Sequence, residues 1–367
     1  MVERKRILTM FWYDDASEVH LYKDVGGIPY ALAKYHGWEA TLAYNDLQGI
    51  IHNDDYEQYV KLEPIHYPKI CARLKLRYYK YLKVMYYVWK NAPHYDVINF
   101  YHVNPLKNLL CFLAKKSNPS IITYVKCDMG REGFIKEQNS SGGVQCWADT
   151  DLFTIETKKY VLKLNLLNKY RNRIKYLPNG FFDVFDTSEN NYFGGFPLDK
   201  DKEHIILTVG RLGTYQKNTE MLVEAFCNLK RNKKLEGWKL YLIGDATSEF
   251  KEFLSKICES NSKLVEDIIL IGRIDNKRVL AGYYNQASLF VMPSRFESWG
   301  LVVSEAMHYA NYVILTDVCD AFYDMTENGK YCTLIRSEDE KGLQEAILCF
   351  VNNYEYPPAG CPTEGFV

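Results

Sequence analysis

The chain has 367 residues, of which 47% are hydrophobic and 25% are charged. This length exceeds what one ordinary hydrophobic core supports, so we expect two domains. The formal net charge of −1 argues against a uniformly basic nucleic-acid-binding protein. No run of about 18 apolar residues is present, and the first apolar run is too short for a signal-peptide core. We therefore expect a cytoplasmic protein whose ten cysteines are reduced.

Short apolar runs alternate with helical patterns through the first half of the chain. The pattern predicts strands at Arg6–Tyr13, Glu39–Tyr44, Asp96–Val103, Ile121–Asp128 and Leu152–Thr157, and helices at Ile28–Tyr35, Pro105–Lys116 and Lys158–Tyr170. Gly26 and Gly27 fall in a predicted loop between the first strand and the first helix. The segment Pro178–Glu203 is rich in Asn, Gly, Asp and Pro, which is typical of a linker between domains.

The same alternation resumes after the linker. Strands are predicted at Ile205–Leu212, Lys239–Gly244, Ile268–Ile274, Leu289–Pro293 and Tyr312–Thr316, and helices at Asn218–Arg231, Ser248–Cys258, Asn276–Gln286, Val302–Tyr309 and Asp339–Asn352. Strands and helices in alternation indicate a parallel sheet covered on both faces. We predict two Rossmann-like, doubly wound α/β domains, residues 1–190 and 191–367, that face a cleft. Ligands of such folds bind at the carboxyl ends of the strands.

The segment SRFESWGLVVSEAM, Ser294–Met307, joins a strand end to a helix that begins near Leu301. A helix start offers unpaired N–H groups to an anion, and Gly300 lets a phosphate approach the backbone. Glu297 lies in the loop and Glu305 about one turn inside the helix, so the two carboxylates can reach different parts of one ligand. The alternative is that Glu297 caps the helix and Glu305 faces solvent.

Further strand ends carry residues suited to a phosphorylated ligand. Gly210 and Arg211 end one strand and Lys217 precedes the next helix, an arrangement that suits a diphosphate. Arg273 and Ile274 end another strand, where exposed backbone could contact a nucleotide base. Gly26-Gly27 could admit a phosphate or a sugar to the backbone, with a simple turn as the alternative.

In this order and spacing, the motifs resemble glycosyltransferase family 4, whose members are retaining enzymes with the two-domain GT-B fold. The strongest match is Glu297 and Glu305 within PSRFESWGLVVSEAM, and the resemblance covers Leu177–Ile335. Gly26-Gly27 and the LPNGFF segment around Asn179-Gly180 also match positions that family members use.

The resemblance implies roles for individual residues. Arg211 and Lys217, beside Gly210, would bind the donor diphosphate, and Glu305 the ribose hydroxyls. Ile274, after Arg273, would flank the base. The transferred sugar would contact Glu297 and the backbone of Ser298, Trp299, Gly300 and Leu301. Gly26 and Gly27 would complete the donor site. The catalytic residues would be Glu297, Arg211 and Lys217.

The expected reaction moves a hexose-type sugar from a nucleoside-diphosphate sugar to a glycan or lipid-linked saccharide. As the donor, a UDP-sugar is favoured over a GDP-sugar. Such a step belongs to surface polysaccharide or glycolipid assembly. The cations and the helix dipole would stabilise the departing diphosphate, so neither a metal nor another cofactor is expected. A non-catalytic nucleotide-sugar-binding or scaffold protein on the same fold is the alternative. An Asp-x-Asp metal site at Asp149-Thr150-Asp151 is another.

The chain departs from the family pattern in two places. The family often has a turn with Gly and Pro after the second glutamate, where this chain reads Tyr309–Asp317. Family members also often carry a histidine near the end of an N-terminal strand that contacts the donor sugar. Asp128 and His102 are the candidates for that sugar- or acceptor-binding role, with a buried structural histidine as the alternative for His102.

Lys69–Lys90 is rich in Lys, Arg and Tyr and contains no acidic residue. A basic helix with Tyr and Trp suits the headgroup layer of an anionic membrane. This segment predicts peripheral binding to the inner face of the membrane. A core-packed helix whose Lys and Arg side chains are solvated is the alternative.

Overall fold

The computed structural model describes residues 4–12, 16–46, 49–67, 77–102, 106–127, 149–167, 171–180, 192–193, 196–197, 202–260, 262–326, 329 and 332–353. The chain divides into two compact units, Met1–Val184 and Phe185–Val367. The domain boundary predicted between residues 190 and 191 lies outside the described residues. No helix among the described residues is long and apolar enough to cross a membrane.

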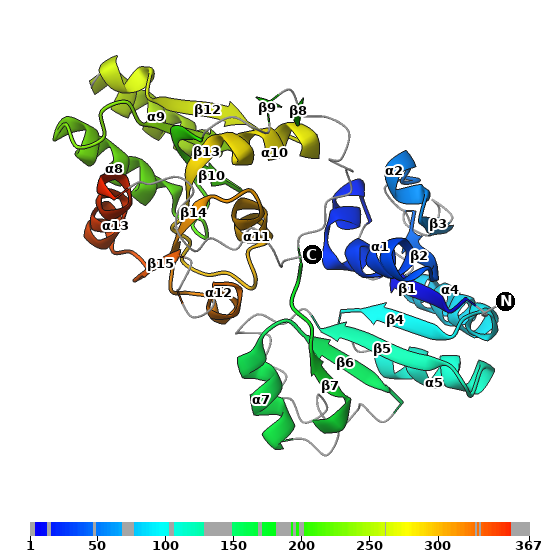
Figure 1. The fold of residues 1–367 in the computed structure, drawn as a ribbon. Helices are drawn as coiled ribbons and strands as arrows, with labels where there is room; N and C mark the ends of the chain where they lie inside the picture. Colours follow the sequence, from blue (N-terminus) through cyan, green and yellow to red (C-terminus); the bar gives the residue numbers. More distant parts are fainter. Residues whose placement is uncertain are drawn as a thin grey trace. The chain divides into compact units, whose positions relative to one another are not determined.

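The first unit is built on a parallel sheet with the strand order β3-β2-β1-β4-β5-β6-β7 (Figure 1). The strands are β1 (Arg6–Phe11), β2 (Glu39–Asn45), β3 (Val60–Ile65), β4 (Val97–Tyr101), β5 (Ile122–Cys127), β6 (Leu152–Ile155) and β7 (Ile174–Tyr176). The helices are η1 (Glu18–Tyr22), α1 (Asp24–His36), α2 (Asp54–Glu57), α4 (Arg77–Asn91), η2 (Ala92–His94), α5 (Lys107–Ser117), α7 (Lys158–Leu167) and η4 (Arg171–Arg173).

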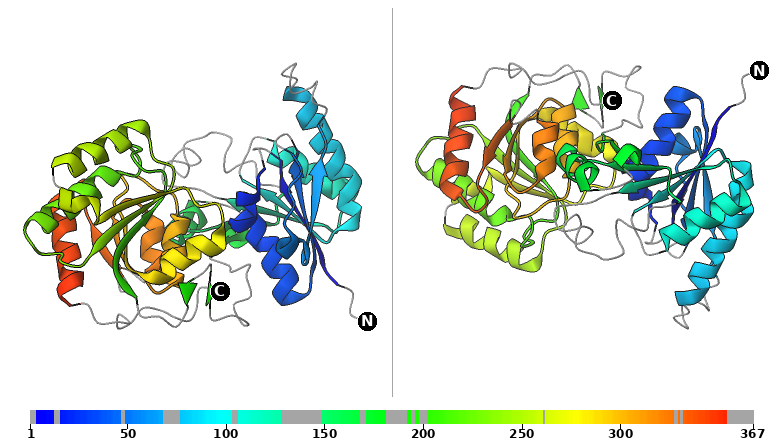
Figure 2. Two further views of the ribbon diagram at one scale, coloured as in Figure 1. Left: turned by 90° about the horizontal axis from the view of Figure 1, so that it is seen from above. Right: turned by 90° about the horizontal axis from the view of Figure 1, so that it is seen from below.

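Helices cover both faces of this sheet. The chain moves outward from β1 through α1 to β2 and crosses back through α4 to β4. Right-handed crossovers in opposite directions place their helices on opposite faces. Figure 2 accordingly shows α1 on one face and α4 and α5 on the other. Side chains of α4, α5 and α7 share one buried apolar cluster with the strands.

The second unit has a parallel sheet with the strand order β12-β11-β10-β13-β14-β15. The strands are β10 (Glu203–Val209), β11 (Lys239–Ile243), β12 (Ile268–Gly272), β13 (Ala287–Met292), β14 (Tyr312–Thr316) and β15 (Cys332–Ile335), and the separate antiparallel pair β8 (Tyr192–Phe193) and β9 (Phe196–Pro197). The helices are α8 (Thr219–Arg231), α9 (Ser248–Ser260), η5 (Ser262–Val265), α10 (Lys277–Gln286), α11 (Leu301–His308), α12 (Asp320–Met325) and α13 (Glu340–Asn352).

Two apolar clusters sandwich this second sheet. The first includes side chains of α8, α9 and α13, and the second includes side chains of α10, α11 and α12. Every residue of β13 is buried, as expected of a parallel strand that is covered on both faces. Both sheets therefore have the doubly wound α/β organisation predicted from the alternating pattern, and that prediction of fold class is confirmed.

Some elements differ from the sequence predictions. The strands β3, β7 and β15 and the helix α12 were not predicted, because they are short and mix polar with apolar residues; β3 even contains Pro64 and lies at the sheet edge, where a proline is tolerated. The predicted loop at Gly26 and Gly27 is wrong, since both residues lie in the first turn of α1. A Cβ on Gly26 would stand 2.3 Å from the carbonyl oxygen of Leu21, so the preceding chain packs directly on this turn.

Candidate functional site

A pocket of about 350 Å³ lies at the carboxyl end of the second sheet, beyond β10, β11 and β12. Its lining includes six residues that the sequence singled out, namely Gly210, Arg211, Lys217, Arg273, Ile274 and Glu297. The carboxyl ends of parallel strands meet at one edge of a sheet, which brings these separated segments together. The remaining lining residues are Val209, Gln216, Ile243, Gly244, Asp245 and Leu280.

The pocket floor depends on a close approach between β10 and β11. Gly244 has a φ of 136°, and a Cβ there would stand 1.7 Å from the carbonyl oxygen of Gly210. The Gly210 N–H donates to the carbonyl of Ile243 at 2.9 Å. Only glycine fits at residue 244 without moving the backbone, so this residue type keeps the two strand ends together beneath the pocket.

Lys217 and Glu297 form an ion pair in this pocket. The Lys217 ammonium donates to Glu297 Oε1, and the Ser294 hydroxyl donates to the same oxygen at 3.0 Å. The exposed fractions of the two side chains are 16% and 8%, so the pair is largely shielded from water. The helix cap of α11 is Gly300; the alternative of Glu297 as a helix cap is therefore wrong.

Gln216, which the sequence analysis missed, links Arg211 to the loop that carries Glu297. The Arg211 guanidinium donates to Gln216 Oε1, and Gln216 Nε2 donates to the carbonyl of Phe296 at 3.1 Å. The Arg295 N–H donates to the Gln216 carbonyl at 2.8 Å. These bonds attach the β10–α8 loop to the β13–α11 loop and hold the Arg211 cation at the pocket.

Glu305 lies on α11 with an exposed side-chain fraction of only 12%, so the solvent-facing alternative is wrong. Lys277 Nζ donates to its Oε1 at 2.7 Å, and the Tyr284 hydroxyl donates to its Oε2 at 2.9 Å. Burial raises the pKa of Tyr284 well above its usual value, and the Glu305 charge raises it further. The phenol therefore remains a protonated donor to the carboxylate at neutral pH.

At the start of α11, the groups that could bind a ligand are mostly backbone atoms. Trp299 is 4% exposed and packs in the apolar cluster, and Cys319 Sγ lies 3.0 Å from the carbonyl of Ser298. Gly300 has a φ of 82°, a left-handed conformation that favours glycine. Leu301 begins the helix directly after it. The Val303 N–H donates to the Gly300 carbonyl at 2.8 Å, whereas the first N–H groups of a helix, here those of Leu301 and Val302, have no partner within the helix.

Arg273 lies at the outer side of the pocket. Its guanidinium contacts Asp275 at 2.7 Å and Asp245 at 3.4 Å, and about half of its side chain is exposed. Ile274, the next residue, lines the same pocket and packs against the apolar cluster of α10, α11 and α12.

The sugar- or acceptor-binding candidates lie in the first unit. His102 follows β4 with a φ of 68° and packs its ring against Tyr101 at 4.2 Å between centroids. Asp128 and residues 68–76 of the basic segment lie outside the described residues. Gly26 and Gly27 lie close by in sequence to Asp24, the first residue of α1.

Asp24 belongs to a buried charged cluster that the sequence analysis missed. Lys126 Nζ lies 3.6 Å from Asp24 Oδ2 and 3.5 Å from Glu156 Oε2, and the Tyr101 hydroxyl donates to Asp24 Oδ1. Lys126 is on β5 and Glu156 directly follows β6. The detectable signal was a lysine inside the mostly apolar strand ITYVKC. The cluster ties the first turn of α1 to the carboxyl ends of β5 and β6.

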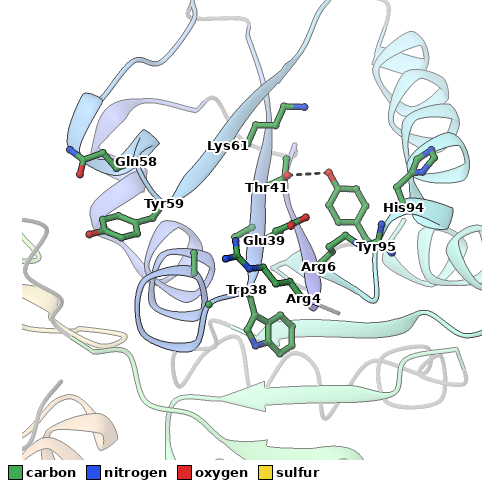
Figure 3. Close-up of a pocket in the computed structure, with 13 residues that line it drawn as sticks. Arg4, Arg6, Trp38, Glu39, Thr41, Gln58, Tyr59, Lys61, His94 and Tyr95 are labelled. Atoms are coloured by element: carbon green, nitrogen blue, oxygen red, sulfur yellow. Dashed lines mark hydrogen bonds between the residues drawn. The ribbon is translucent and has the colours of Figure 1, made fainter. Parts of the chain in front are cut away.

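A second pocket, of about 610 Å³, lies in the first unit, at the amino ends of the strands of its sheet. Figure 3 shows Arg4, Glu39 and Lys61 on its walls and the hydrogen bond of 3.1 Å from the Tyr95 hydroxyl to Thr41. Glu39 is the first residue of β2, so this pocket lies at the amino ends of the strands. Ligands of doubly wound folds bind at the opposite ends, and the second-unit pocket is therefore the candidate site.

Among the described residues, no group of three His, Cys, Asp or Glu side chains is arranged to hold a metal. In the Asp149-Thr150-Asp151 segment, Asp151 pairs with Lys115 at 2.6 Å and accepts from the Thr123 N–H at 2.9 Å. This carboxylate therefore joins α5 to β5.

The family-model match to known proteins falls in the second unit. Residues 203–353 match the family model of Glycosyl transferases group 1. The amylovoran biosynthesis glycosyltransferase AmsD of Erwinia amylovora is 33% identical over 139 residues, which are 38% of this chain and 32% of that protein. The lipopolysaccharide core biosynthesis mannosyltransferase LpsB of Rhizobium meliloti is 29% identical over 143 residues, 38% of this chain and 39% of that protein. The matched segments thus span well under half of these curated relatives.

Solved structures match nearly the whole chain. The Anabaena protein HepE in complex with UDP has a TM-score of 0.64 at 15% identity and covers 98% of this chain and 93% of its own. The lipopolysaccharide outer core galactosyltransferase WaaB has a TM-score of 0.62 at 14% identity and covers 95% and 90%. At these identities the likeness shows the fold, and the predicted GT-B architecture is confirmed. Membership of family 4 and a retaining mechanism stay predictions.

Proposed function

We propose that this GT-B chain is a retaining glycosyltransferase of family 4 that moves a hexose-type sugar from a nucleoside-diphosphate sugar to a saccharide acceptor. The observation that carries the proposal is the convergence of Arg211, Lys217 and Glu297 in one pocket at the carboxyl end of the second sheet. Two cations and a carboxylate in a partly enclosed pocket suit a sugar diphosphate, whose phosphates need positive charge and whose sugar needs hydroxyl acceptors.

Donor binding would change the contacts of the Lys217–Glu297 ion pair in this pocket. Cleavage of the sugar–phosphate bond leaves negative charge on the diphosphate, and Lys217 and Arg211 would stabilise that charge. A diphosphate that bound Lys217 would compete with Glu297 for its ammonium, and the carboxylate would then be free to accept hydrogen bonds from the sugar. Loss of one such stabilising donor costs about 100- to 1,000-fold in turnover in well-studied enzymes.

The nucleotide would extend from this diphosphate site. Glu305 would accept hydrogen bonds from the ribose hydroxyls, Ile274 would flank the base, and the first turn of α11 would face phosphate and sugar. We favour a UDP-sugar over a GDP-sugar, and the UDP bound to the structurally similar HepE supports that preference. The chemistry requires no metal, because the cations that face the leaving group belong to the protein.

The acceptor in this proposal is a glycan or a lipid-linked saccharide. The names of AmsD and LpsB refer to assembly of an exopolysaccharide and of lipopolysaccharide core, which supports a role in surface polysaccharide or glycolipid synthesis. In the first unit, His102 and Asp128 are the proposed sugar- or acceptor-binding residues, and Gly26-Gly27 is proposed as donor-binding. Lys69–Lys90 would place the enzyme at the inner face of the membrane.

A thermal-shift panel with UDP, GDP and their sugars tests donor binding directly, because a ligand that binds the folded state raises the melting temperature. The nucleotide sugar with the largest shift is then assayed for nucleotide release. We expect slow release with water as acceptor and faster release with a saccharide acceptor. If donors raise the melting temperature but no release or transfer is detected, the non-catalytic alternative is correct.

A further inference from the structure

Positive charge is concentrated on two neighbouring helices of the first unit. The helix α4 contains four Lys or Arg residues and α5 contains three, and neither contains an acidic residue. The whole chain, by contrast, has 45 basic and 46 acidic residues. The two helices cover the same face of their sheet (Figures 1 and 2). Lys107 is buried and Lys115 pairs with Asp151 at 2.6 Å, so α5 adds Lys116 to the positive charge of α4 on this face.

An apolar stripe runs along the solvent side of α4. Leu82, Tyr86 and Trp89 are 62%, 60% and 53% exposed. Their spacing of four and three residues places them on one side of the helix. Val84 and Val88 are fully buried on the opposite side and attach α4 to the sheet. The helix thus buries one apolar face and presents a second one to solvent, which core packing does not require.

The helix α5 extends this stripe. Leu109 and Phe112 are 38% and 43% exposed, whereas Leu110 and Cys111 are fully buried. The carboxyl ends of the two helices are joined, because the Ser117 hydroxyl donates to the carbonyl of Trp89 at 2.5 Å. The exposed apolar side chains of α4 and α5 therefore belong to one surface.

Lysines flank these apolar side chains. Lys90 follows Trp89 and is exposed. Lys83 lies between Leu82 and Tyr86 in sequence, and its ammonium donates to the carbonyl of His66 at 3.0 Å on the exposed surface. The Lys116 ammonium lies 5.6 Å from the centre of the Phe112 ring. We call the surface made by these eight residues the α4–α5 face: Leu82, Lys83, Tyr86, Trp89, Lys90, Leu109, Phe112 and Lys116.

We propose that the α4–α5 face docks on a bilayer that contains anionic phospholipid. Lysine ammonium groups attract lipid phosphates, and Tyr and Trp place an apolar ring and a polar edge at headgroup depth. Leucine and phenylalanine side chains between them enter the boundary of the acyl chains. The inference extends the basic segment of α4 to α5. Docking would also bring the first unit to a lipid-linked acceptor, and only this consequence rests on the proposed function.

The test is co-sedimentation of the full chain with vesicles of phosphatidylcholine, with and without phosphatidylglycerol. We expect binding to the mixed vesicles that falls with added salt, and little binding to pure phosphatidylcholine. The triple variant Lys83→Gln, Lys90→Gln and Lys116→Gln should bind the mixed vesicles roughly 100-fold more weakly, from the usual contribution of each lysine near an anionic surface. Trp89→Ser should also weaken binding, with little change in its salt dependence.

A matched control neutralises three exposed lysines of the second unit, Lys234, Lys251 and Lys256, and should bind as the wild type does. Equal melting temperatures establish that the variants are folded. The proposal is overturned if the wild type does not sediment with mixed vesicles, or if the triple variant binds as well as the control. Nucleotide release, measured without vesicles, should be unchanged in the triple variant. Absence of release in the wild type would refute the proposed function and leave the vesicle result unaffected.

Discussion

Replacement of Glu305 by glutamine tests whether this carboxylate recognises the ribose. Each of its oxygens accepts a hydrogen bond, from Lys277 at 2.7 Å and from Tyr284 at 2.9 Å. In Glu305→Gln an NH2 group replaces one of these oxygens and faces a donor. The side chain can no longer serve both partners, and its charge opposite Lys277 is lost. We therefore expect both a misoriented side chain and a weaker acceptor for ribose hydroxyls.

The magnitude follows from the type of bond that is lost. A hydrogen bond to a charged group contributes about 1.5–3 kcal/mol, so the affinity for the nucleotide should fall roughly 10- to 150-fold. Tyr284→Phe removes one donor but keeps the carboxylate, and its effect should be smaller. Glu249→Gln, on the exposed surface of α9, is the matched control and should leave the affinity unchanged.

Isothermal titration with UDP and with 2′-deoxy-UDP measures this effect, and GDP with its deoxy form provides the second pair. The wild type should prefer the ribonucleotide, and Glu305→Gln should lose most of that preference together with affinity. The reasoning is refuted if the wild type binds both forms equally, or if Glu305→Gln and the wild type have the same dissociation constant for UDP.

Three further predictions concern the second-unit pocket. Lys217→Ala and Glu297→Ala should each lower turnover about 100-fold or more, and wild-type nucleotide release in either variant would contradict the assignment. Turnover should be fully retained in EDTA; its loss, restored by added metal, would favour a metal-dependent transferase. Gly244→Ala should lower the free energy of unfolding by about 3 kcal/mol or more, because it adds a clash with Gly210 to the strain of a positive φ. Gly272→Ala, with a φ of 87° and open space around it, is the control for strain alone and should cost about 1–2 kcal/mol in urea unfolding. Equal losses in the two glycine variants would show that the close approach of the strands is not required.

The alternation of apolar runs and helical patterns was sufficient to predict both doubly wound sheets. The resemblance to glycosyltransferase family 4 implied that Gly210, Lys217, Arg273 and Glu297 belong to one site, and they line one pocket although they span almost ninety positions. The reason is geometric: parallel strands all end at the same edge of their sheet, so residues that follow strands become neighbours. The short strands β7 and β15 were missed because so few residues carry too weak a periodic signal.

Ser294–Met307 was recognisable in the sequence as a strand end, a loop and a helix start with two glutamates. Only the tertiary structure decided what those glutamates contact: Lys217 and Ser294 for Glu297, and Lys277 and Tyr284 for Glu305. The lysine inside the strand ITYVKC was visible in the sequence, but its pairing with Asp24 and Glu156 was likewise decided only by the tertiary structure. Local periodicity determines which residues follow a strand or face a sheet. The partner of a side chain depends on strand order, loop path and rotamer, which are properties of the packed chain.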